Sequence, residues 1–66
     1  MDTEHLNVQP NLIDPDGFYS ALVDMHRDLD AARSEQANAR LILLLANHIG
    51  DPEVLREALL IARENL

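Results

Sequence analysis

The sequence predicts an all-α fold, a compact three-helix bundle that follows a flexible N-terminal arm. From residue 15 onward, apolar side chains recur every three or four positions, which is the spacing of one face of a helix. Asp-Pro pairs at residues 14–15 and 51–52 place a capping carboxylate and a proline at two helix starts, where proline's missing N–H is no loss. No stretch shows the alternation of a half-buried strand. Short connections between the helices favour antiparallel neighbours.

Residues 1–11 form the predicted arm, and residues 12–66 form a single helical domain. The arm has no apolar periodicity and contains Asn, Gln, Thr and Pro, residues that are common in irregular chain. Terminal segments of this kind are poorly ordered unless the rest of the domain holds them. We therefore expect the arm to be flexible or loosely docked on the helices.

The first helix is predicted to span about residues 15–29. Asp14 is placed to cap it, although the string DPDG is also a good turn and would let the helix begin two residues later. Ile13 and Phe18 have the spacing of a hydrophobic staple around this cap. The side chains predicted to share the inward face of this helix are Phe18, Leu22, Met25 and Leu29.

The second helix is predicted to span about residues 31–49, and the third about residues 52–64. Either Asp30 or Ser34 can cap the second helix, because nothing between them interrupts the helical pattern. Gly50 follows its last residue and suits the left-handed turn that commonly ends a helix.

The second helix contains more apolar residues than one face needs. Leu41 and Leu45 belong to a wide arc that we expect the other two helices to cover. Leu43 falls near the polar back of the second helix, and Leu60 falls on a charged face of the third. Single exposed leucines are ordinary in soluble proteins, but these two also suit contact with a protein partner.

The charge balance excludes several classes of function. The chain has five basic and twelve acidic residues, a net charge of −7, so we expect it to bind neither nucleic acid nor an anionic membrane surface. The chain has no cysteine, which fits a cytoplasmic protein and excludes disulfides. A chain of 66 residues buries only about 60% of its unfolded surface, so its core is marginal unless a partner adds to it.

Several polar and aromatic residues are candidates for roles beyond the core. Asn38 and His48 project from the inner half of the second helix, and we predict that both are buried and satisfy nearby backbone groups. Tyr19, Val23 and His26 share a flank of the first helix, where they either cover the edge of the core or form a recognition patch.

The chain offers no set of residues for catalysis. It lacks a cysteine nucleophile, a GxSxG string and a glycine-rich phosphate loop, and no two histidines have the spacing that places two metal ligands on one helix face. A chain this short also has little room for a pocket of a few hundred Å³. We therefore expect no enzyme activity, no cofactor and no metal site.

Two strings, DPDGFYSALVDMHRDL and NARLILLLANHIGDPEVLREAL, resemble a bacterial family, Domain of Unknown Function 2783. The resemblance covers about residues 10–63 and implies a short proteobacterial protein, often encoded near aromatic-catabolic or FAD-dependent oxygenase genes, and hence an accessory subunit. The chain departs from the family pattern at Ala37, where Leu is frequent, and at Arg33 and Ser34, where the helix start is usually more acidic. The motif positions carried over, none with an implied role, are Asp14, Phe18, His26, Arg27, Asn38, Arg40, Asn47, His48, Gly50 and Asp51.

We interpret the chain as a small, acidic, non-catalytic interaction module. It would be an accessory or regulatory subunit of a larger cytoplasmic protein, for which the resemblance suggests a flavin-dependent oxygenase. The alternative is a structural protein that self-associates as a homodimer. An acyl-carrier-like protein is a more distant alternative, since neither Ser20 nor Ser34 lies in the D-S-L context that carries a prosthetic arm. The candidate partner surface consists of Leu43, Leu60, Tyr19, Val23 and His26.

Overall fold

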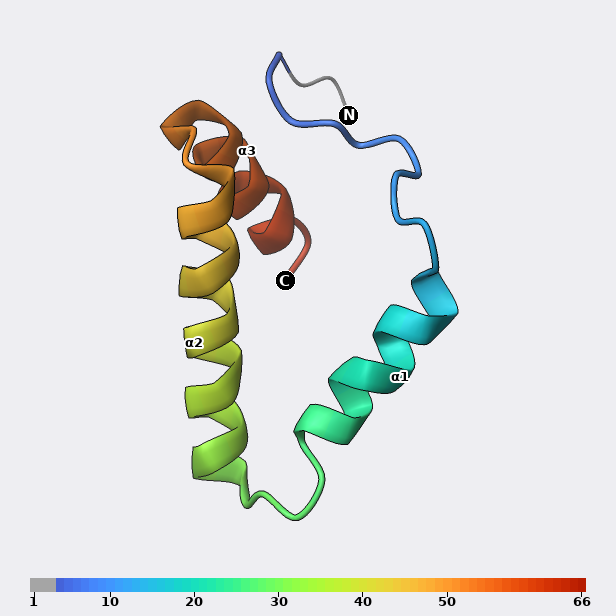
Figure 1. The fold of residues 1–66 in the computed structure, drawn as a ribbon. Helices are drawn as coiled ribbons and strands as arrows, with labels where there is room; N and C mark the ends of the chain where they lie inside the picture. The colour runs from blue at the N-terminus through green and yellow to red at the C-terminus, as the bar shows by residue number, and fades with distance from the viewer. Residues whose placement is uncertain (1–3) are drawn as a thin grey trace.

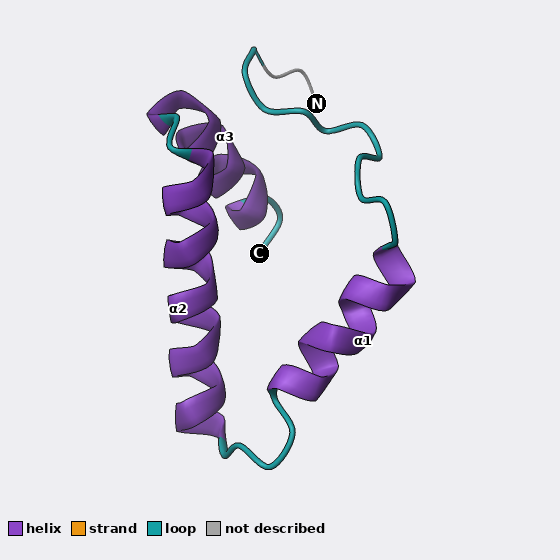
Figure 2. Ribbon diagram, in the orientation of Figure 1, coloured by secondary structure: helices purple, strands orange, loops and turns teal. Residues whose placement is uncertain are grey.

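The computed structural model describes residues 4–66 as three helices joined by loops (Figure 1). Helix α1 spans Pro15–Met25, α2 spans Ala31–Ile49 and α3 spans Pro52–Arg63. The part of the chain that is described contains no strand (Figure 2). The predicted all-α fold with three helices is confirmed. The α2 bounds are those expected, and α3 ends one residue before the predicted end.

Each helix begins where an aspartate carboxylate caps its first turn. Asp14, Asp30 and Asp51 accept hydrogen bonds from backbone N–H groups two or three residues further on, at 3.0, 2.8 and 2.9 Å respectively. These N–H groups have no partner within the helix, so each cap contributes about 1 kcal/mol to helix formation. Of the two candidate starts for α2, the structure has Asp30 rather than Ser34.

Helix α1 ends four residues earlier than predicted. After Met25 the chain forms a tight turn, in which the N–H of His26 bonds to the carbonyl of Val23 at 3.1 Å. Asp28 then adopts a left-handed backbone with φ of 63°, which a helix cannot continue through. The apolar spacing up to Leu29 suggested a longer helix because that pattern does not register a change in backbone conformation.

Gly50 forms the corner between α2 and α3, as predicted. Its φ of 76° is left-handed, and its N–H donates to the carbonyl of Ala46 at 2.8 Å, which closes the last turn of α2. Residues with a Cβ are strained in this conformation, whereas glycine is not. Asp51 and Pro52 then start α3, which folds back alongside α2 (Figure 1).

The three helices do not enclose a core. None of residues 4–66 is buried, and the radius of gyration is 13.6 Å, whereas a close-packed chain of this length has about 11 Å. The expected covering of Leu41 and Leu45 is wrong for Leu45, which is 49% exposed, while Leu41 is half-buried. The reason is that α1 diverges from α2 along most of its length (Figure 1). The expected hydrophobic staple is also absent, because Ile13 is fully exposed.

The arm returns toward α3. The backbone N–H groups of Glu4, His5 and Leu6 all donate to the carboxylate of Glu57, at 3.1, 3.1 and 2.7 Å. The predicted arm thus includes a docked segment, while residues 1–3 lie outside the described residues. The division of the chain at residues 11 and 12 stays a prediction.

Candidate protein-binding surfaces

One exposed face of α2 carries apolar and polar side chains side by side. Leu43 and Leu44 are 68% and 70% exposed, among the most exposed leucines of the helices. Together with Arg40 and Asn47 they line an open hollow of about 380 Å³. The four residues recur at the spacing of one helix face, so the hollow follows the helix surface. Neither the Arg40 nor the Asn47 side chain forms a hydrogen bond or ion pair within residues 4–66.

A second candidate surface is the flank of α1. Tyr19 and Val23 are both exposed, as a recognition patch requires. His26, at the end of the same helix, is half-buried, and its Nε2 lies 3.0 Å from Oδ1 of Asn38 on α2. In the tautomer with hydrogen on Nε2, His26 donates this bond. His26 therefore joins α1 to α2, and the exposed recognition patch on this flank reduces to Tyr19 and Val23.

Leu60 lies apart from the other candidates, on α3. It is 61% exposed and shares a helix with the ion pair between Arg56 and Glu53. The five candidate partner residues thus lie in, or directly after, three different helices. Sequence spacing places residues on a face of their own helix, but it does not tell how the helices are oriented.

The prediction that Asn38 and His48 are buried polar groups is wrong, because both are exposed. The arc of α2 that carries them was expected to face a closed core, and the helices do not close around it. Asn38 still has a structural role, since it accepts the hydrogen bond from His26. The His48 side chain makes no hydrogen bond or ion pair among the described residues, so the expected bond to a nearby backbone group is absent.

Glu57 was not identified from the sequence as more than a charged surface residue. Burial raises the pKa of Glu57, but the hydrogen bonds from the N–H groups of Leu6, His5 and Glu4 outweigh this and hold that pKa below its ordinary value. The ionised carboxylate therefore fastens the arm to α3. No local signal in the sequence reveals this contact, because its donors are backbone groups about fifty residues away.

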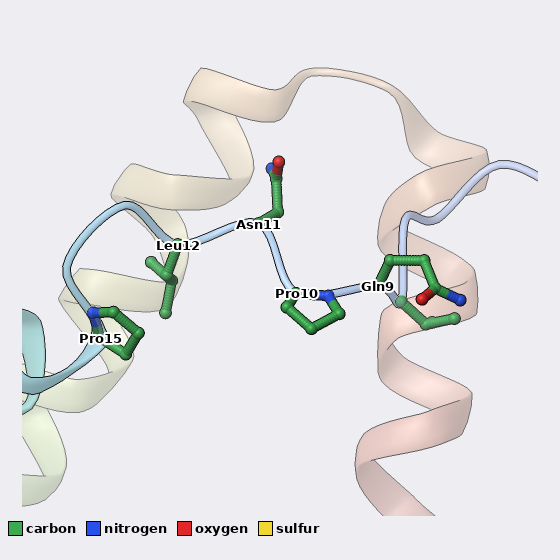
Figure 3. A pocket seen from close by; sticks show the side chains of 6 residues that line it. Gln9, Pro10, Asn11, Leu12 and Pro15 are labelled. Atoms are coloured by element: carbon green, nitrogen blue, oxygen red, sulfur yellow. The ribbon is translucent and has the colours of Figure 1, made fainter.

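The loop before α1 lines a second open hollow, of about 460 Å³ (Figure 3). Both hollows are larger than we expected for so short a chain, because they lie open on the surface and need no enclosing walls. None of the lining side chains ionises at ordinary pH, so this hollow has no acid–base group. Its lining residues are Val8, Gln9, Pro10, Asn11, Leu12 and Pro15.

The described residues include neither a metal-binding group of side chains nor a membrane-spanning helix. No three His, Asp or Glu side chains are grouped so that they could hold a metal ion. No helix of this part of the chain has the length and apolar character needed to cross a bilayer.

Comparison with known proteins adds one finding. A family model described as Protein of unknown function (DUF2783) matches residues 6–64. This region contains all three helices and every candidate residue of the surfaces described above. No curated protein and no solved structure matches the chain.

Proposed function

The chain belongs to the DUF2783 family, and we propose that it is a non-catalytic interaction module, an accessory or regulatory subunit of a larger protein. The observation that carries this proposal is that none of residues 4–66 is buried. Burial of apolar surface is the main favourable term in folding, so an isolated chain with this arrangement has little to stabilise it. A protein that binds only the folded chain would supply the missing stabilisation.

Charge indicates the kind of partner surface. The twelve acidic residues all fall within residues 2–35 and 51–64, in the arm, in and beside α1, at the start of α2, and in and beside α3. These parts of the module suit a protein with a basic rim around an apolar patch. Such complementarity speeds association and rejects partners with acidic surfaces. The same charge disfavours nucleic acid as a ligand.

The exposed flank of α1 is the contact that we assign to this larger partner. Tyr19 presents an amphipathic ring and Val23 an aliphatic side chain, a combination that is common at protein interfaces. The family resemblance points to a flavin-dependent oxygenase as the first partner to examine. The proposed compartment is the cytoplasm, in keeping with a chain that has no cysteine.

Affinity purification of the tagged chain from its native cells tests this proposal. The double variant Tyr19→Ser and Val23→Ser removes the α1 patch, and Ser20→Gln, on another face of the same helix, is the matched control. We expect one larger protein in near-stoichiometric amount with the wild type and the control, and its loss with the double variant. Recovery of no such protein, or equal recovery with all three chains, would contradict the proposal.

A further inference from the structure

We propose that two copies of this chain pair through α2, antiparallel across a two-fold axis that passes between Leu43 and Leu44. This inference concerns a different face from the α1 flank and so goes beyond the accessory role. Three observations support it: the amount of surface that one chain exposes, the distribution of carboxylates along the chain, and the order of side chains on the exposed face of α2.

The chain exposes much more surface than its mass requires. Its solvent-accessible area is 6046 Å², whereas a close-packed monomer of 7.4 kDa exposes about 4,200 Å². The difference of roughly 1,800 Å² exceeds the roughly 800 Å² that each partner buries in a standard protein–protein interface. One chain therefore has enough uncovered surface for a stable dimer and for a further contact.

The charge distribution identifies the second copy as the occupant of the α2 face. Residues 36–50 contain no carboxylate and carry a single charged side chain, that of Arg40. Copies of a chain with a net charge of −7 repel each other wherever their carboxylates meet, and this segment is where they meet least. A basic partner would instead prefer the acidic α1 and α3, so charge separates the two contacts.

The exposed face of α2 is complementary to itself. Arg40, Leu43, Leu44 and Asn47 line one hollow, and the two polar residues lie at equal distances on either side of the leucine pair. In an antiparallel pair centred between the leucines, Leu43 of each copy is level with Leu44 of the other, and Arg40 is level with Asn47 of the other. The guanidinium of Arg40 can then donate to Oδ1 of Asn47, twice across the axis.

This pairing also gives a partner to Leu43, which the helical spacing places outside the apolar face of α2. Leu43 lies opposite Leu41 on α2 and cannot reach a core formed by α1 and α3. In Figure 1, α1 and α3 both lie on the same side of α2, which leaves the other side of this helix uncovered. A leucine pair flanked by a polar pair at each end resembles the seam of a coiled coil, in which polar residues fix the register.

The mass of the purified full chain in solution is the first test. By light scattering over a range of concentrations, we expect twice the 7.4 kDa of one chain for the wild type. The double variant Leu43→Glu and Leu44→Glu should lose the dimer. The control is Leu60→Glu, which changes a similarly exposed leucine on α3 and should leave the dimer intact. A wild-type monomer at every concentration, a dimer that survives in the double variant, or equal loss in the Leu60→Glu control would overturn the proposal.

Disulfide cross-linking tests the geometry even if the glutamate variants fail to fold. The chain has no cysteine, so single-cysteine variants report one contact at a time. Leu44→Cys should link to itself across the axis. Arg40→Cys and Asn47→Cys should link to each other when mixed, and little to themselves, because like residues lie about 10 Å apart along the helices. Efficient self-linking of Arg40→Cys would show parallel pairing and overturn the proposed axis.

The two proposals fail separately. A chain that stays monomeric, yet captures a larger protein through Tyr19 and Val23, would overturn the α2 dimer and leave the accessory role intact. A dimer that captures no larger protein would overturn the accessory role and leave the α2 dimer intact. The α2 variants should leave capture through α1 unchanged, since none of them lies on that flank.

Discussion

Helices α1 and α3 are built alike but held differently. Both begin with an Asp-Pro pair whose carboxylate caps the first turn. Helix α3 turns back on α2 at Gly50 and binds the arm through Glu57. Helix α1 is joined to α2 by the longer connection of residues 26–30 and diverges from α2 (Figure 1). Local signals therefore determine where a helix forms, while contacts with distant residues determine where it lies.

The largest effect on stability is expected from straining the corner that holds α3. Gly50→Val places a β-branched residue at a φ of 76°, and we expect this to lower the free energy of unfolding by about 1–2 kcal/mol. Gly50→Asn should lose much less, because Asn tolerates the left-handed region. Urea unfolding at one fixed chain concentration measures both. Equal losses in the two variants would show that backbone conformation at this corner is unimportant.

Protonation of Glu57 should release the arm and leave α3 in place. The fold holds the pKa of Glu57 below its ordinary value of 4.5, so the stabilisation from this contact is fully present above pH 4.5. It is lost as the pH falls through the lowered pKa. NMR shifts of the amides of residues 4–6, followed from pH 6 to pH 2, should show this transition.

Glu57→Gln removes the ionisable carboxylate, so we expect the transition of the arm amides to disappear. The matched control is Glu64→Gln, a change of the same charge at an exposed residue near the end of α3. Arm amides that titrate alike in the wild type and in both variants would mean that Glu57 does not hold the arm.

The smallest effect is expected at the contact that holds α1. Asn38→Ala removes the acceptor for His26 and should cost about 0.5 kcal/mol, as for a partly exposed hydrogen bond. We expect the Asn38→Ala variant to show a broader range of α1–α2 distances, which is easier to detect than this loss of stability. Spin labels at Ser20→Cys and Glu35→Cys, diluted with unlabelled chain, measure that range, and Gln36→Ala is the control. An unchanged distribution would assign the orientation of α1 to other contacts.

Helix boundaries were predictable because their signals are local. Asp30, Asp51 and Gly50 act within one turn of their own positions, and the structure has α2 at the predicted bounds. The early end of α1 at Met25 was missed, because apolar spacing does not record a left-handed residue such as Asp28. The contact of the arm with Glu57 was not predicted either, because it joins groups far apart in the sequence.

Burial was the least predictable property of the chain. The sequence indicates that Leu41, Leu43 and Leu45 need cover, but not whether α1, α3 or another protein gives it. Asn38 and His48 were expected to be buried on that account, and both are exposed. A helical pattern shows which face is apolar, whereas the covering of that face depends on every chain present.

The central claim is that one chain does not close its own core and that association with another protein surface stabilises it. Hydrogen exchange of the α2 amides at Leu41–Leu45, measured in the isolated chain over a wide range of concentrations, tests this most directly. We predict weak protection in dilute solution and protection that rises as the chains associate, by up to about 1.4 kcal/mol of dimer for each tenfold increase. Strong protection that is independent of concentration, in a chain that remains monomeric, would contradict the claim.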